Sequence, residues 1–123
     1  MLKSYAFIIT LIYSAALTVV CLMPLNGVIK VNITLGDKIF HAVTYMILSF
    51  LWYHTFYYHF NKSKAKALLY AMLLSIIFGI IIEVLQGTVT AYRSSDINDV
   101  LANTIGVLLM SVVIGIKNKF KVN

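Results

Sequence analysis

The stretch Y-A-F-I-I-T-L-I-Y-S-A-A-L-T-V-V-C-L-M, from Tyr5 to Met23, contains no charged residue. As a helix it is about 28 Å long, close to the roughly 30 Å thickness of a bilayer's hydrocarbon core. The rest of the chain has the same character, because 61% of its 123 residues are hydrophobic and only 11% are charged. That composition lies outside the range of soluble domains. The stretch therefore predicts a transmembrane helix, and the chain an integral membrane protein.

Three more apolar stretches follow the first one. The sequence thus predicts an all-α, polytopic fold with four transmembrane helices, at about residues 5–23, 39–60, 67–85 and 99–116. No linker between them is long enough to hold a second domain, so residues 1–123 are expected to form a single four-helix domain.

The distribution of the cations predicts the orientation of these helices, because Lys and Arg are enriched in cytoplasmic loops. With both termini inside, seven cations lie on the inner side: Lys3, Lys62, Lys64, Lys66, Lys117, Lys119 and Lys121. Three lie on the outer side: Lys30, Lys38 and Arg93. The excess of cations on the inner side, seven against three, favours an N-in, C-in topology. The net charge of +6 then suits anionic inner-leaflet lipid, and a nucleic-acid partner is not expected.

In this topology the acidic residues gather at the outer end of the helices. The chain has four of them: Asp37, Glu83, Asp96 and Asp99. Residues three, four or seven positions apart share a helix face. The polar faces are Asp37, His41 and Tyr45 on the second helix, Glu83 and Gln86 on the third, and Asp96, Asp99, Asn103 and Gly106 on the fourth. Three helices are therefore expected to present polar faces at the same depth.

Glu83 lies within a predicted span, where an ionisable side chain costs about 2.5 to 3.5 kcal/mol on insertion scales. Such a group normally faces the bundle interior or a wet cavity. One interpretation is structural, with Glu83 satisfied by Arg93 or His41 or reaching interfacial water. The other is functional, with Glu83 and His41 lining an outward-facing cleft as proton-transfer or binding groups.

The remaining polar residues also have structural alternatives. Asp37 suits a helix cap, and Asp96 with Asp99 resembles a capping pair that favours the helix dipole. Asn103 suits a hydrogen bond to a neighbouring helix. Arg93 is either a solvated loop cation or a fork for a phosphate or carboxylate.

These residues resemble the VanZ-like family of membrane proteins. The pattern consists of D-K-x2-H-x3-Y from Asp37 to Tyr45, E-x2-Q from Glu83 to Gln86, and R-x2-D-x2-D-x3-N-x2-G from Arg93 to Gly106. The resemblance covers the chain from Asp37 to Gly106 and rests on three blocks at helix entries or exits. It implies a multi-pass protein of the bacterial cytoplasmic membrane. The family is named for an association with resistance to the glycopeptide antibiotic teicoplanin, and its biochemical activity is not well defined.

Several function classes are not expected, because their motifs are missing. The sequence has no phosphate-binding P-loop, no dinucleotide fingerprint, no H-E-x-x-H and no nucleophile elbow. The acids and His41 could in principle hold a divalent cation through oxygen and nitrogen ligands. Because these spacings on helices also occur by chance, no metal site and no cofactor are predicted.

Three hypotheses remain open. In the first, the outward cleft binds a cell-envelope amphiphile such as a lipid-linked wall precursor or a glycolipid. Its expected ligand-binding residues are Asp37, Lys38, Tyr45, Gln86, Arg93, Asp96, Asp99 and Asn103. In the second, the protein is an enzyme on a similar substrate, with Glu83 or His41 as general acid or base. In the third, the chain is an accessory subunit of a larger membrane complex or a homo-oligomer, and its polar residues serve folding alone.

Overall fold

The computed structural model describes residues 2–22, 34–88 and 97–120, and these residues form four α-helices and one π-helical segment. The elements are α1 (Leu2–Leu22), α2 (Thr34–His54), η1 (Thr55–His59), α3 (Lys64–Thr88) and α4 (Ile97–Phe120). The predicted all-α fold with four helices is confirmed.

The helices extend beyond the apolar stretches that predicted them. α3 begins at Lys64 rather than near residue 67, and α4 continues through Lys117 and Lys119 to Phe120. Lysine has a high helix propensity, so a helix does not end where its apolar run ends. α2 begins at Thr34 rather than near residue 39, and the last part of the predicted second span is the π-helical η1.

Three of the helices are long and apolar enough to cross a membrane. They are α1 over Tyr5–Leu22, α3 over Lys64–Thr88 and α4 over Ile97–Phe120. α2 has 21 residues and is not among these three in the part of the chain that the structure describes. A fourth span by composition is therefore not shown, although the chain folds into four helices.

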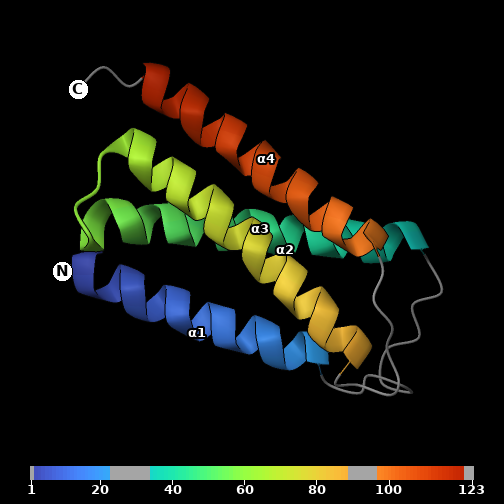
Figure 1. Cartoon of the computed structure of the whole chain (residues 1–123). Helices are drawn as coiled ribbons and strands as arrows, with labels where there is room; N and C mark the ends of the chain where they lie inside the picture. Colours follow the sequence, from blue (N-terminus) through green and yellow to red (C-terminus); the bar gives the residue numbers. More distant parts are fainter. Residues whose placement is uncertain (1, 23–33, 89–96, 121–123) are drawn as a thin grey trace.

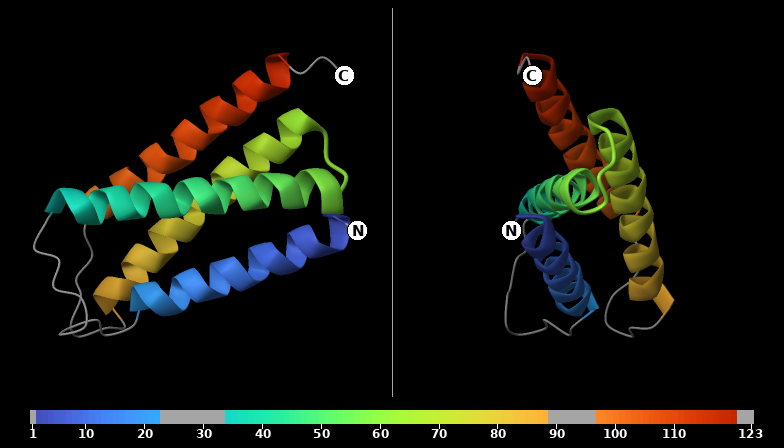
Figure 2. Two further views of the ribbon diagram at one scale, coloured as in Figure 1. Left: turned by 180° about the vertical axis from the view of Figure 1, so that it is seen from behind. Right: turned by 90° about the vertical axis from the view of Figure 1, so that its left-hand side faces the viewer.

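Helix α2 has three neighbours. Among the described helices it packs against α1, α3 and α4, whereas α1 and α4 make no contact with each other. Seen along the bundle, α2 lies between α1 and α4, with α3 beside it (Figure 2). Its inner faces can therefore carry polar side chains that would be costly against lipid, while its remaining face exposes large hydrophobic side chains, which are Ile39, Phe40, Val43, Ile47 and Phe50.

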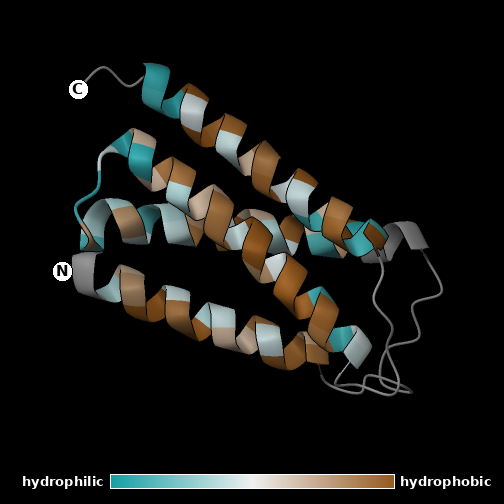
Figure 3. Cartoon of the chain, in the orientation of Figure 1, coloured by the Kyte–Doolittle hydropathy of each residue, from teal (hydrophilic) through white to brown (hydrophobic). Residues whose placement is uncertain are grey.

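The outer faces of α1, α3 and α4 are apolar. Large hydrophobic side chains are exposed along all three, including Ile12, Leu73, Ile77, Leu109 and Val112. Hydrophobic residues follow the middle of these helices, and hydrophilic residues lie at the start of α3 and the end of α4 (Figure 3). Because no water-soluble protein exposes so much continuous apolar surface, these faces are suited to contact lipid.

The chain reverses direction between η1 and α3 in four residues, 60–63. Asn61 has a φ of 57°, in the left-handed region that asparagine tolerates better than most residues. The Phe60 amide donates to the Thr55 carbonyl, and the Lys62 amide donates to the Phe56 carbonyl. Ser63 then caps α3 by accepting from the Lys66 amide through its hydroxyl oxygen. This tight turn places η1 beside the start of α3, at the same end as both chain termini (Figure 1).

The closest approach of two helices is the crossing of α2 and α4. A Cβ atom added to Gly106 would lie 2.1 Å from the Ala42 carbonyl oxygen. The two backbones are therefore in direct contact, which small residues allow in membrane helix pairs. α4 crosses α2 near its own start and diverges from it toward the C-terminus (Figure 1).

Replacing Gly106 with alanine should destabilise the protein. The added methyl group meets backbone atoms, which cannot rotate away, so the two helices must separate. Overpacking of this kind typically costs about 1–3 kcal/mol. We expect the melting temperature in detergent to fall by about 5 °C or more.

Gly115→Ala is the matched control, because a Cβ at Gly115 meets nothing within 4 Å. It lies on the same helix and should leave the melting temperature unchanged or raise it slightly. Equal effects of the two substitutions would contradict the backbone crossing at Gly106.

Candidate functional site

A cluster of polar side chains joins α2 to α4 close to the start of each helix. The Lys38 ammonium group donates to Asp99 Oδ1 and forms an ion pair with it. His41 Nδ1 lies 3.1 Å from Asn103 Oδ1, and His41 Nε2 lies 3.6 Å from Asp99 Oδ2. Helical spacing creates this pairing, since Lys38 and His41 are three residues apart and Asp99 and Asn103 are four apart. We call these four residues the polar cluster.

The surroundings of His41 restrict the way in which it can be protonated. The Asn103 oxygen can only accept, so Nδ1 must carry the proton of this hydrogen bond. Nε2 lies within ion-pair range of the Asp99 carboxylate but outside hydrogen-bond distance of it. An imidazole beside a carboxylate is a combination of groups used in acid–base catalysis.

Helix α3 meets the polar cluster at Gly79. A Cβ at Gly79 would lie 3.1 Å from Asn103 Nδ2 and 3.1 Å from Tyr45 Cε2. The Tyr45 side chain is almost completely buried, and within the described part of the chain its hydroxyl group has no hydrogen-bond partner. A buried hydroxyl without a partner costs about 1–3 kcal/mol, so water or a ligand atom would stabilise it.

Glu83 and Gln86 are buried on α3, with 4% and 3% of their surface exposed. Gln86 Nε2 donates to the Cys21 carbonyl oxygen at 2.9 Å, which ties α3 to the end of α1. Within the described ranges, no hydrogen bond or ion pair joins Glu83 to His41.

The predicted site residues fall into three groups in the structure. Those on α2 and α4 that the structure brings together are Lys38, His41, Asp99 and Asn103, with Tyr45 next to them. Glu83 and Gln86 face the same interior from α3. The predictions for the Asp37 side chain, Arg93 and Asp96 concern positions outside the described residues. The helical stripes proposed from spacing are thus buried, although burial alone does not assign them a function.

Two features of this region were not predicted from the sequence. One is the role of Gly79, whose missing side chain leaves room for Asn103 and Tyr45. Its position one helical turn before Glu83 is the signal that places both on one face. The other is the Cys21 carbonyl as the acceptor for Gln86, because carbonyl groups at a helix end leave no trace in sequence.

The polar cluster has few of the ligands that a metal ion requires. Within the described ranges, no group of three or more His, Cys, Asp or Glu side chains converges. His41 and Asp99 supply two donor atoms, and the Lys38 ammonium group competes for the same carboxylate. The arrangement is better suited to hydrogen bonding, because it combines a carboxylate, an amide, an imidazole and an ammonium group.

Comparison with known proteins gives a family match. The model of the VanZ/LLP1 family matches residues 4–118, which include the polar cluster, α2, α3 and most of α1 and α4. No curated protein and no solved structure matches the chain.

Substitutions of Lys38 and Asp99 should be energetically coupled. Their side chains are only 20% and 12% exposed, so the ion pair is poorly screened by water. We expect Lys38→Met and Asp99→Asn each to destabilise by about 1–3 kcal/mol. The double variant should lose less than the sum, by about 1 kcal/mol, in thermal or denaturant unfolding.

The control is the exposed Lys66 at the other end of the molecule. Lys66→Met combined with Asp99→Asn should show additive effects, because the two residues share no partner. Additivity in the Lys38 cycle as well would mean that the ion pair contributes nothing to folding.

Proposed function

The chain belongs to the VanZ/LLP1 family, and from the geometry of the polar cluster we propose that it binds a cell-envelope amphiphile in the bacterial cytoplasmic membrane. The class of ligand is a lipid-linked wall precursor or a glycolipid, which combines a polar headgroup with a lipid chain. A link to glycopeptide resistance is part of this proposal through the family name alone.

The observation that carries the proposal is the concentration of polar groups in the interior of one end of a membrane protein. Four buried side chains there can form hydrogen bonds: His41, Glu83, Asp99 and Asn103. Buried ion pairs can often be replaced by apolar residues without loss of stability. Stability alone is therefore a weak reason for burying these groups, which favours an additional role in recognition.

Charge balance indicates what kind of headgroup fits. Asp99 neutralises Lys38, so Lys38 contacts an anion only in competition with that carboxylate. The Tyr45 hydroxyl, the Asn103 amide and the His41 ring are suited to sugar hydroxyls or peptide groups. Arg93, which lies outside the described residues, is the proposed contact for a phosphate or carboxylate.

Entry to the polar cluster is proposed from its Lys38 side. The Lys38 side chain is 20% exposed, whereas the residues beneath it are buried. A headgroup approaching between the starts of α2 and α4 would meet Lys38 and Asp99 first and His41 and Asn103 next. The exposed apolar faces of the helices would accompany the lipid chain.

An enzymatic variant of the proposal uses the pair formed by His41 and Asp99. His41 would act as general base or acid on a headgroup hydroxyl, since the ring lies between an amide oxygen and a carboxylate. Glu83 is the second proposed proton acceptor. Turnover is therefore expected to depend on Glu83 or His41, and binding on the whole cluster.

A second candidate function is a structural subunit of a larger membrane complex. It is favoured by one observation, which is that the described contacts of the polar cluster and of Gln86 all link one helix to another. Interhelical hydrogen bonds of this type stabilise membrane bundles by about 0.6 kcal/mol each on average. In this case the exposed apolar faces would meet a partner protein.

The proposed orientation places the polar cluster on the outer side of the membrane. At the opposite end, beside the termini, lie five described lysines: Lys62, Lys64, Lys66, Lys117 and Lys119. The polar-cluster end has Lys38 as its described lysine. This asymmetry supports a cytoplasmic location of the termini.

Cysteine labelling tests the orientation. Ser63 is exposed in the turn between η1 and α3, and Ile97 is exposed at the start of α4. In intact cells, a membrane-impermeant maleimide should label Ile97→Cys, whereas Ser63→Cys should react only after permeabilisation. Native Cys21 is buried and serves as the unlabelled background. Labelling of Ser63→Cys in intact cells would reverse the orientation and place the polar cluster inside.

Native mass spectrometry of gently extracted protein tests the function. Wild type should retain an envelope amphiphile, and the Arg93→Ala, Glu83→Gln double variant should lose it while accumulating normally. Glu83→Gln alone preserves shape and removes one charge, so an enzyme would keep its substrate and lose turnover.

Ser75→Ala is the matched control on α3, because Ser75 is buried and its hydroxyl group has no hydrogen-bond partner in the described part of the chain. It should retain the amphiphile at the wild-type level. Absence of any specific amphiphile from wild type, together with a co-purifying protein and poor accumulation of the double variant, would favour the structural subunit instead.

A further inference from the structure

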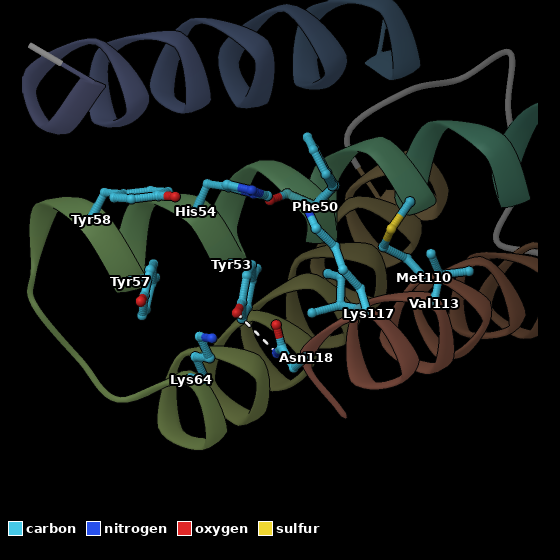
Figure 4. A pocket seen from close by; sticks show the side chains of 11 residues that line it. Phe50, Tyr53, His54, Tyr57, Tyr58, Lys64, Met110, Val113, Lys117 and Asn118 are labelled. Atoms are coloured by element: carbon cyan, nitrogen blue, oxygen red, sulfur yellow. Dashed lines mark hydrogen bonds between the residues drawn. The ribbon is translucent and has the colours of Figure 1, made fainter. Parts of the chain in front are cut away.

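A second site lies at the opposite end of the molecule, between the end of α2, η1 and the end of α4. The divergence of α4 from α2 leaves a groove of about 330 Å³ there. Tyr53 and Tyr57 point from α2 and η1 toward Lys64 at the start of α3 and Asn118 on α4 (Figure 4). The wall nearer the membrane centre is apolar and consists of Phe50, Met110, Val113 and Ile114.

The groove carries positive charge and no acidic side chain among its lining residues. Lys64 and Lys117 line it from two different helices. Asp99 lies in the first turn of α4 and Lys117 in the last, so about 27 Å of helix separate them. At that distance the carboxylate does not neutralise the lysine.

Helix stability does not account for Lys64. It is the first residue of α3, and the N-terminus of a helix already carries a partial positive charge. No acidic residue is present in the first turn of α3 to compensate. An anion bound in the groove would lie beside Lys64 and would relieve the repulsion between its ammonium group and the helix N-terminus.

The groove also offers a directed neutral donor. Asn118 Nδ2 donates to the Tyr53 hydroxyl oxygen at 3.1 Å. The tyrosine's own proton takes part in no hydrogen bond within the described residues, and Tyr53 lines the groove. The bond from Asn118 fixes the position of the Tyr53 hydroxyl group, whose proton can then be donated to a ligand. Together with the Lys64 and Lys117 ammonium groups, it forms a set of donors that matches a phosphate ester.

We propose that this groove binds the phosphate headgroup of an anionic phospholipid from the leaflet at the end of the bundle where the termini lie. Lys64 and Lys117 contact the phosphate oxygens, and the Tyr53 hydroxyl donates to one of them. Basic pockets between membrane helices on the cytoplasmic side are suited to such lipids.

The dimensions of the groove fit a headgroup rather than a whole lipid. A volume of about 330 Å³ is at the lower limit for small-molecule pockets. The acyl chains therefore extend outside it, over the exposed surfaces of Phe50 and Val113. A phospholipid would contact both the polar lining of the groove and the apolar surface beside it, whereas a free phosphate would contact only the polar lining.

The test is lipid retention in native mass spectrometry after exchange into mixed micelles of phosphatidylglycerol and phosphatidylcholine. Wild type should retain phosphatidylglycerol preferentially. Lys64→Gln with Lys117→Gln should reduce that retention by about tenfold. The conservative pair Lys64→Arg with Lys117→Arg keeps the charges and should restore it, which separates a binding role from a folding defect.

Lys66→Gln with Lys119→Gln is the matched control, because both lysines are exposed and neither lines the groove. It removes the same charge from the same two helices and should leave retention unchanged. Equal losses in the two glutamine pairs would overturn the proposal in favour of general electrostatic attraction. Equal retention of the two lipids by wild type, or full displacement of phosphatidylglycerol by millimolar inorganic phosphate, would overturn it as well.

Discussion

The contact between the backbones of α2 and α4 at Ala42 and Gly106 is the constraint on which the other features depend. It brings the two helices close enough for Lys38 to reach Asp99 and for His41 to reach Asn103. The same crossing makes α4 diverge from α2 at the other end, where the groove beside Tyr53 opens. A single glycine therefore determines both a tightly packed polar region and an open basic one.

The two ends of the bundle differ in how their charged side chains are neutralised. At the start of α2 and α4, opposite charges are paired within a nearly dry interior, where an isolated charge would be costly. At the other end, lysines stand without acidic neighbours in the groove, at the level where lipid headgroups supply negative charge. In the proposed lipid-binding role, anionic headgroups would offset part of the net charge of +6.

Helical periodicity predicted the residues that face the interior, because a stripe of polar residues on an apolar helix is costly against lipid and therefore faces the other helices. His41 and Tyr45 on α2, and Asp99 and Asn103 on α4, are buried as that reasoning implies. Periodicity does not specify which helices are neighbours or at what depth they cross. The pairing of Lys38 with Asp99 depends on the crossing at Gly106, which no local pattern reveals. The basic groove was missed for the same reason, since Lys64 and Lys117 are 53 positions apart in sequence.

The polarity of α2 has a consequence for biogenesis. Hydrophobicity identifies helices that insert by themselves, and α2 is not among the three described helices whose length and composition fit a membrane span. Its closest partner is α4, which is synthesised after α2 and α3. The polar side of α2 is therefore paired with α4 only after the fourth helix has been made, so that stable insertion of the second helix depends on synthesis of the fourth.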